Sequence, residues 1–160
     1  MYTEQVMKHF KNPQNIGKIE NPDGIGKVGN VVCGDVMWFY IKVEDNKIVD
    51  VKFQTFGCVV AIAVSSILTT MVKGKTVEEA MDTTKFDILK NAGKVPPIKV
   101  HCSVLAADAL HEAIYDYLTK NKMEIPEKLE KEHWRIKKEL EKVETEHPEH
   151  VKLEEEVLNK

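Results

Sequence analysis

The sequence predicts an α+β fold in which helices pack on a three-stranded antiparallel sheet, followed by a charged helical C-terminal extension. Over residues 49–55 apolar and polar residues alternate, which is typical of a half-buried strand. Residues 59–72 contain no Lys, Arg, Asp or Glu, and the run is too short to span a bilayer, so we expect a helix buried in the core. After this run the pattern is mostly helical, so the strands come first and the helices follow.

The first part of the chain supplies one short helix and the start of the sheet. Thr3 is expected to cap a helix that stops before Asn12-Pro13. Residues 12–30 are rich in Asn, Gly and Pro and are expected to form an irregular loop, with Val31-Val32 as the end of a first strand. Cys33-Gly34-Asp35 has the composition of a tight turn, because Gly gives the backbone freedom and Asp tolerates turn geometry.

Two more strands complete the predicted sheet. Residues 36–43 form a nearly continuous apolar run rich in β-branched and aromatic residues, as expected of a central strand. Asp45-Asn46-Lys47 is expected to be the hairpin turn that leads into the strand over 49–55. Three consecutive antiparallel strands result.

The helical half begins after Lys73-Gly74, which we expect to end the buried helix. Thr76 has capping-box spacing to Glu79 and opens a short helix, and residues 84–92 form another. Residues 95–99 are expected to be extended, because a proline moves the residue before it away from helical angles. Ser103 is expected to cap a long amphipathic helix.

Residues 122–160 differ from residues 1–121 in their density of charge, and we treat the two ranges as an extension and a domain. Leu129, Ile136 and Val143 recur every seven residues, which predicts one helix with a narrow apolar seam. Because this seam is shorter than three heptads, we favour a helix that folds back on the domain. An element for homo-oligomerisation is the alternative.

Composition limits the classes of function. The net charge of −3 gives no basic signature for nucleic-acid binding. No apolar run is long enough to span a membrane, and the N-terminus lacks the charged-then-apolar pattern of a secretory signal. We therefore expect a cytoplasmic protein with neither nucleic acid nor membrane as a partner.

The cysteines are the most informative residues. There are three of them, Cys33, Cys58 and Cys102, so they cannot all pair within the chain. Cys58 stands where a strand turns into the buried helix, beside Gly57, which lets another group approach the backbone. Cys102 lies at the start of the long helix. The positive end of a helix stabilises a thiolate, so these positions favour a site over inert buried thiols.

The candidate site residues are Cys33, Asp35, Cys58, His101 and Cys102. Three thiolates and one carboxylate or imidazole make four ligands, which suits Zn²⁺ or an iron–sulfur cluster. A carboxylate is a poor permanent ligand in iron–sulfur chemistry, so it would leave a cluster exchangeable, as a carrier requires. The residue-level alternatives are that Asp35 only shapes the turn and that His101 only orients a neighbour or faces solvent.

The remaining histidines are expected on the surface; they are His9, His111, His133, His147 and His150.

Several segments resemble the IscU family of iron–sulfur cluster assembly scaffolds, to which the N-terminal domain of NifU is related. The resemblance covers residues 1 to about 120, in order and with compatible spacing. It includes the N-terminal segments Tyr2-Thr3-Glu4-Gln5-Val6 and Asn12-Pro13-Gln14-Asn15-Ile16-Gly17. Its core is three segments that each hold one cysteine: Cys33-Gly34-Asp35-Val36-Met37, Phe56-Gly57-Cys58 with Ala61-Ile62-Ala63, and His101-Cys102-Ser103 with Leu105-Ala106.

The resemblance implies an IscU/SufE-like α+β fold and a scaffold that performs no classical catalysis and is therefore not an enzyme. It implies a cluster on Cys33, Cys58 and Cys102, with Asp35 or His101 as the exchangeable fourth ligand. A [2Fe–2S] cluster is the expected form, and Zn²⁺ is the alternative occupant. Sulfur would come from a cysteine desulfurase, and the finished cluster would pass to apo-proteins.

Two details qualify the resemblance. Val95-Pro96-Pro97-Ile98-Lys99 is similar to a Leu-Pro-Pro-Val-Lys segment that the family presents to an Hsp70-type chaperone, although both aliphatic residues differ here. Val59 follows Cys58 where the family usually has Gly. Lys99 is a candidate for neutralising an anionic cluster.

A second class of function comes from the SufU branch of the same superfamily. These sulfurtransferases bind zinc with the same Cys/Asp set and relay persulfide from their desulfurase. They carry an insertion between the second and third cysteines that this chain lacks, so the scaffold is preferred. Because the resemblance ends near residue 120, we expect cluster assembly to survive removal of residues 122–160.

Overall fold

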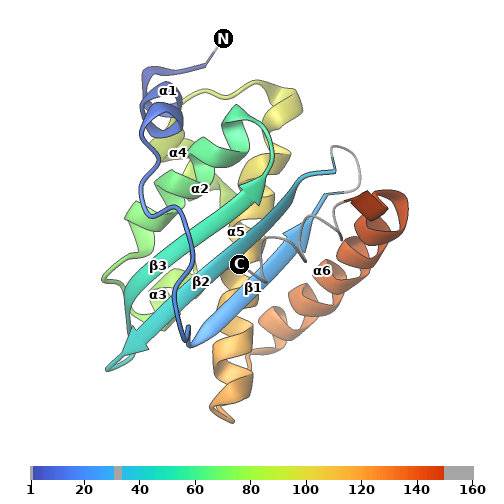
Figure 1. Cartoon of the computed structure of the whole chain (residues 1–160). Helices are drawn as coiled ribbons and strands as arrows, with labels where there is room; N and C mark the ends of the chain where they lie inside the picture. The colour runs from blue at the N-terminus through green and yellow to red at the C-terminus, as the bar shows by residue number, and fades with distance from the viewer. Residues whose placement is uncertain (1, 31–33, 150–160) are drawn as a thin grey trace.

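A computed structural model describes residues 2–30 and 34–149, and the predicted α+β architecture is confirmed. One layer is a sheet of three strands, and helices cover it (Figure 1). The strands are β1 (Gly24–Gly29), β2 (Val36–Glu44) and β3 (Lys47–Phe56). The helices are α1 (Glu4–Lys11), α2 (Val59–Val72), α3 (Val77–Met81), α4 (Lys85–Ala92), α5 (His101–Lys120) and α6 (Glu127–Glu146), with a 3₁₀ turn, η1 (Pro97–Lys99), before α5.

The sheet is antiparallel in the order β1-β2-β3, with β2 in the centre as predicted. Asp45 and Asn46 form the tip of the β2–β3 hairpin, and both have the positive φ angles of a tight hairpin turn (50° and 61°). The prediction for β1 was wrong, because this strand lies at 24–29, inside the range assigned to a loop. The assignment of Val31-Val32 to a strand end falls outside the described residues.

Glycines explain why β1 is a strand despite its composition. A Cβ atom at Gly24 or Gly26 would overlap the carbonyl oxygens of Ala113 and Ala109 on α5. Only glycine lets the helix backbone approach the strand this closely. Close contact with the backbone of α5 therefore fixes strand β1 at Gly24 and Gly26, where there is no side chain to show a strand pattern.

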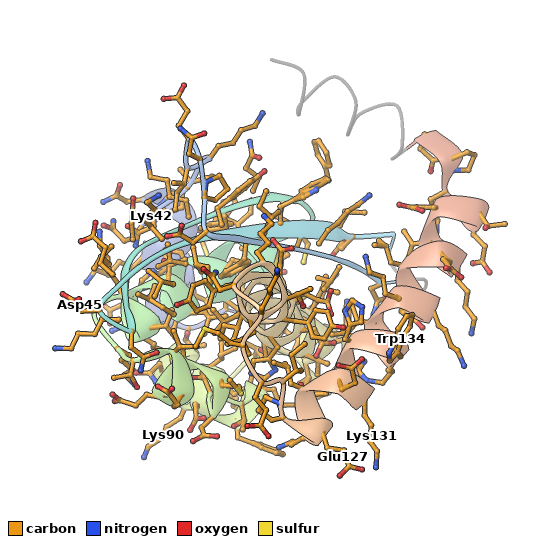
Figure 2. All side chains as sticks on the ribbon, turned by 90° about the horizontal axis from the view of Figure 1, so that it is seen from below. Lys42, Asp45, Lys90, Glu127, Lys131 and Trp134 are labelled. Carbon is orange, nitrogen blue, oxygen red and sulfur yellow. The ribbon has the colours of Figure 1, made fainter. Side chains whose placement is uncertain are left out.

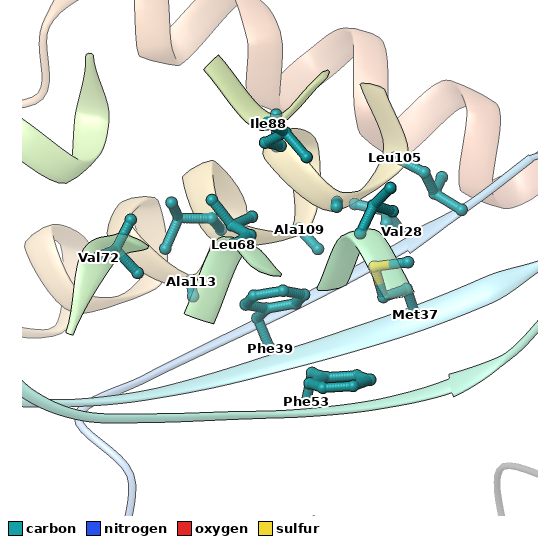
Figure 3. Close-up of a cluster of buried hydrophobic side chains, with 14 of the residues drawn as sticks. Val28, Met37, Phe39, Phe53, Leu68, Val72, Ile88, Leu105, Ala109 and Ala113 are labelled. Carbon is teal, nitrogen blue, oxygen red and sulfur yellow. The ribbon is translucent and has the colours of Figure 1, made fainter. Parts of the chain in front are cut away.

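The core lies between the sheet and the helices α2 and α5. Figure 3 shows Phe39 and Phe53 on the sheet, with Leu68 of α2 and Ala109 and Ala113 of α5 above them. The two phenylalanine rings are stacked across neighbouring strands, with their centroids 6.0 Å apart. Helix α2 is buried along most of its length, as its uncharged sequence predicts.

The helix starts test the capping predictions. Thr3, Thr76 and Thr84 each accept a hydrogen bond from a backbone N–H in the first turn of their helix, so these predicted starts are confirmed. Ser103 does not cap α5, because that helix begins at His101. The predicted extended segment 95–99 is wrong in its second half, because η1 already turns the chain at Pro97 and so starts the helical path earlier.

Helix α6 folds back on the domain, as the favoured reading of the extension predicts. It lies along the edge strand β1 and also contacts α5 (Figure 1). The seam residues are buried: Leu129, Ile136, Leu140 and Val143. Figure 2 shows Glu127 and Lys131 pointing away from the molecule, where they form an ion pair of 3.2 Å. Covering an edge strand also removes a surface on which other chains could add strands.

The prediction for two histidines was wrong. His111 on α5 and His133 on α6 are buried, with 8% and 9% of their surface exposed. His111 Nδ1 lies 3.1 Å from Glu132 Oε2, and His133 Nδ1 lies 2.7 Å from Glu112 Oε1. Each histidine is buried because a carboxylate on the facing helix satisfies its ring nitrogen. In the described part of the chain, no helix combines the length and the apolar character that crossing a membrane requires.

Candidate metal centre

Three of the predicted site residues meet at one end of the sheet. One donor atom each from Asp35, Cys58 and Cys102 lies within 4.8 Å of the other two. The two sulfur atoms are 3.7 Å apart and are not bonded to each other. Asp35 directly precedes β2, Cys58 follows β3, and Cys102 is in the first turn of α5. The fold therefore brings together residues that are up to 67 positions apart (102 − 35).

The local backbone holds Asp35 in place. Its carbonyl oxygen accepts a hydrogen bond from the Asn30 N–H (2.9 Å), and the Gly34 N–H donates to the Asn30 carbonyl oxygen (2.8 Å). Gly34 has φ +70°, a left-handed conformation that suits glycine. The backbone on both sides of the Asp35 Cα is therefore anchored to Asn30, which places the carboxylate at the start of β2.

The Asp35 carboxylate is buried without full hydrogen bonding among the described residues. Its side chain is 9% exposed, and its Oδ2 is buried without a hydrogen-bond partner among the described residues. Leaving a carboxylate oxygen buried and unpaired is costly unless a cation or a donor binds it. This orphaned oxygen beside two sulfur atoms fits a ligand for a metal ion.

Gly57 makes room for that carboxylate. A Cβ atom at Gly57 would come within 2.8 Å of the Ala61 Cβ and 3.3 Å of the Asp35 Cγ. The prediction that another group approaches the backbone beside Cys58 is confirmed, and the group is the Asp35 side chain. Thr55 stabilises the same corner, because its hydroxyl donates to the Val36 carbonyl oxygen (2.8 Å). No sequence pattern indicated this role of Thr55.

Cys58 occupies the N-cap position of α2, as predicted. Its pKa falls from 9.0 to about 5, chiefly because it accepts a hydrogen bond from the Cys102 thiol. Burial opposes this shift, the backbone N–H groups of Ala61 and Val60 support it, and the charge of Asp35 opposes it. Cys58 is consequently a thiolate at neutral pH and is ready to bind a metal.

Lys99 ends η1 just before α5, and His101 is the first residue of α5. The His101 Nε2 is 3.6 Å from the Cys102 Sγ, but His101 is not part of the group whose donors all lie within 4.8 Å of one another. The negative charge of Cys58, followed by smaller contributions from Cys102 and Asp35, raises the pKa of the Lys99 ammonium. Lys99 therefore places a positive charge near the anionic group.

Cys33, the remaining predicted ligand, lies outside the described residues. Its neighbour Gly34 is in the turn that carries Asp35.

The chemistry of this donor set is selective. Two sulfur donors suit thiophilic metals such as zinc and iron, whereas the carboxylate oxygen is a harder donor that exchanges more readily. The set is asymmetric and lies at the end of the sheet where loops meet. It can hold a metal or cluster with at least one weak ligand.

Comparison with known proteins gives consistent results. The model of the family described as "NifU-like N terminal domain" matches residues 1–124. The chain is 56% identical over 121 residues to the iron-sulfur cluster assembly scaffold protein IscU 1 of Archaeoglobus fulgidus, which covers 76% of this chain and 79% of the relative. It is 50% identical over 121 residues to the scaffold protein IscU of Aquifex aeolicus, covering 74% of this chain and 77% of that protein.

A solved structure agrees with the fold. The crystal structure described as a putative iron-sulfur cluster assembly scaffold protein for the SUF system, FiSufU from Fervidobacterium islandicum AW-1, superposes with a TM-score of 0.62 and 28% identity. The match covers 71% of this chain and 96% of that structure.

Proposed function

The chain belongs to the NifU-like N-terminal domain family, and from this premise we propose that it is an iron–sulfur cluster assembly scaffold. It accepts iron and sulfur, assembles a labile cluster and passes it to apo-proteins. The observation that carries the proposal is the approach of the Asp35, Cys58 and Cys102 donors within 4.8 Å of one another. The cluster is the cargo of the protein, and we propose a carrier that performs no classical catalysis.

We assign the ligands from the donor set. Cys58 and Cys102 supply two thiolates, Cys33 supplies the third, and Asp35 supplies the exchangeable oxygen. The buried, unpaired Oδ2 of Asp35 favours it over His101, which approaches the group only beside Cys102. A [2Fe–2S] cluster remains the expected form, with Zn²⁺ as the alternative occupant of the same ligands.

The decisive experiment is anaerobic reconstitution with iron and sulfide. The parent protein should become brown and contain acid-labile sulfide, and Cys33→Ser, Cys58→Ser and Cys102→Ser should each abolish stable cluster binding with unchanged far-ultraviolet circular dichroism. Asp35→Ala should lengthen the lifetime of the cluster and slow its transfer to an apo-ferredoxin, because the labile ligand is gone. Equal transfer rates would remove Asp35 from the mechanism.

The same preparation tests the zinc-dependent persulfide relay. A colourless protein with one zinc per chain that iron and sulfide cannot convert would support the relay. The similarity to FiSufU, at 28% identity, keeps this test necessary. In either case we propose that a cysteine desulfurase is the sulfur donor.

The segment Val95-Pro96-Pro97-Ile98-Lys99 is our candidate for an Hsp70-type chaperone. Ile98 is 78% exposed on η1, whereas Val95 is largely buried. An apolar side chain held outward beside two prolines is available to a partner. Ile98→Asp should weaken binding of the chaperone without changing cluster reconstitution.

We propose that residues 1–121 form the assembly domain and that residues 122–160 are an extension. All the proposed ligands lie in the first part. A chain that ends at residue 121 should therefore still assemble a cluster, and failure to do so would contradict this division. Light scattering of the full chain, with and without a cluster, measures whether it forms a homo-oligomer.

The proposed location is the cytoplasm. The Sγ atoms of Cys58 and Cys102 lie 3.7 Å apart with no disulfide bond between them, and a reducing compartment keeps such a pair unlinked. Thiol alkylation of freshly lysed cells, followed by mass spectrometry, should find both cysteines reduced.

A further inference from the structure

Two sulfur atoms of the candidate metal centre lie close enough to be joined. The Sγ atoms of Cys58 and Cys102 are 3.7 Å apart and are not bonded to each other. A disulfide bond is about 2 Å long, so bond formation requires the two atoms to approach by a further distance of less than about 2 Å. Cys58 is the N-cap of α2, and Cys102 lies in the first turn of α5. The bond would therefore join two helix starts that the fold already holds side by side.

The two thiols differ in their access to solvent. Cys102 is fully buried, with 0% of its surface exposed, whereas Cys58 is partly exposed. Gly57, the residue before Cys58, is itself exposed and has no side chain to shield the sulfur atom. A reagent in solution therefore meets the Cys58 sulfur first, and Cys102 is the buried thiol next to it.

An accessible thiol beside a buried one is the arrangement that stepwise thiol–disulfide exchange requires. The attacking sulfur must touch the incoming disulfide, and a second thiol must lie within reach of the mixed disulfide that forms. The position of Cys58 at the start of α2 also favours its thiolate, which is the attacking form. Burial protects the second thiol from separate reaction with the reagent, so it is kept for the second step.

We propose that Cys58 is a site of exchange with low-molecular-weight disulfides such as oxidised glutathione, and that Cys102 is its resolving thiol. The inference rests on the proposed scaffold function, in which both cysteines are ligands. A bond between them removes two of the donors, so the empty scaffold is closed to metal and cluster until a thiol reduces it. Loading of the scaffold thus depends on the thiol–disulfide balance around it.

The exchange takes two steps. The Cys58 thiolate attacks one sulfur of glutathione disulfide, forms a mixed disulfide and releases the first glutathione as a thiolate. The Cys102 thiol then attacks the Cys58 sulfur, the mixed disulfide breaks, and the second glutathione leaves with the Cys102 proton. The protein loses two electrons, and these reduce one glutathione disulfide to two molecules of glutathione.

Peptide mapping tests the pairing directly. The full chain, free of metal, is reduced, separated from the reductant, treated with glutathione disulfide and trapped with N-ethylmaleimide. Trypsin places each cysteine on its own peptide, because residues 28–42 hold Cys33, residues 53–73 hold Cys58 and residues 100–120 hold Cys102. The dominant cross-link should join peptide 53–73 to peptide 100–120. A dominant cross-link to peptide 28–42, or no cross-link at all, would overturn the pair.

Three serine variants establish the order of the steps, with far-ultraviolet circular dichroism as the check on folding. Cys33→Ser loses a proposed cluster ligand but should still form the cross-link, at the parent rate within about twofold. Cys102→Ser should stop at the mixed disulfide and keep one glutathione on Cys58. Cys58→Ser should slow the reaction of Cys102 with glutathione disulfide by at least about tenfold, because the remaining thiol is buried. Equal rates for Cys58→Ser and the parent would overturn the role of Cys58.

Metal binding separates this inference from the scaffold function. Protein closed with glutathione disulfide should bind Zn²⁺ at least about tenfold more weakly than reduced protein, and dithiothreitol should restore the affinity. Equal zinc affinity of closed and reduced protein overturns the link between exchange and loading. Reduced protein that assembles a cluster but forms no cross-link overturns the exchange pair alone. Reduced protein that forms no cluster contradicts the scaffold function, whereas the peptide map still decides the exchange pair.

Discussion

Helices α2 and α5 meet the sheet through apolar side chains, whereas α6 meets its neighbours through a short apolar seam and paired charges. On the α2/α5 side, large side chains such as Phe39, Phe53 and Leu110 are fully buried. On the α6 side, the contact with α5 contains one ion pair, Asp108–Arg135, and two histidine–carboxylate pairs. Apolar burial supplies most of the stability of a domain, and a partly exposed ion pair such as Asp108–Arg135 supplies little.

This difference separates two tasks. The α2/α5 layer fixes the fold and carries Cys58 and Cys102 at the starts of its two helices. The α6 layer carries none of the proposed ligands, and its attachment is the weaker of the two. A change in the first layer should therefore affect stability and the site together, whereas a change in α6 should leave the fold intact. Four predictions test this separation.

The largest effect is expected in the main core. Phe39→Ala should lower the free energy of unfolding by about 3–5 kcal/mol, because it leaves a cavity between the sheet and α2. Urea denaturation of the apo-protein measures this change. A loss below about 1 kcal/mol would show that the two layers do not differ as proposed.

The next effect is a change in the pKa of Cys58, which stands at the start of α2 in the same layer. Cys102→Ala should raise the pKa of Cys58 from about 5 by at least one unit, because the hydrogen bond from Cys102 is the main cause of its low value. One unit corresponds to about 1.4 kcal/mol. The pH dependence of Cys58 alkylation by iodoacetamide, followed on its peptide by mass spectrometry, gives the midpoint. The α6 variant Arg135→Ala is the control and should leave that midpoint in place.

A smaller effect is expected for the α6 pairs. Arg135→Ala should lower the free energy of unfolding by roughly 0.5–1 kcal/mol, because the Arg135 side chain is 55% exposed although that of its partner Asp108 is only 13% exposed. Chemical denaturation at low and high salt measures the loss, which should shrink as salt screens the pair. A loss comparable to that of Phe39→Ala would contradict the comparison.

The smallest effect is a change in pH dependence. Burial raises the pKa of Glu112 above 4.5, against the opposing hydrogen bond from His133. The folded state therefore holds this proton more tightly than the unfolded state does, and stability is lost as pH rises from 4.5 through the raised value. Glu112→Gln removes that loss and keeps an oxygen to accept from His133. Relative to its own value at pH 4, the variant should be less destabilised at pH 6 than the parent in thermal melts.

Much of this organisation is readable from the sequence, and the exceptions have physical causes. The alternation at 49–55 and the uncharged run at 59–72 depend on local burial, so they predicted β3 and α2 correctly. Strand β1 was missed because Gly24 and Gly26 carry no side-chain pattern, and the reason for them is a contact with a helix about 85 residues later. Contacts between distant segments leave no periodic signal.

The same absence of a periodic signal explains why the burial of two histidines and part of the site were not predicted. His111 and His133 look like surface residues because their carboxylate partners are on another helix. The approach of Asp35, Cys58 and Cys102 followed from motifs at three turns, and the ligand roles of these residues, like those of Cys33 and His101, stay predictions.

The glycines of β1 have a consequence for the sulfur atoms. They let the sheet touch α5 near Ala109 and Ala113, which lie roughly 10–16 Å along the helix from Cys102. Helix α5 would pivot about this contact if the spacing between strand and helix changed. A bulkier residue at Gly24 or Gly26 would tilt the helix, and a tilt of only about 5° over such an arm displaces its tip by about 1 Å. The spacing of two thiols thus depends on the absence of a methyl group several turns away.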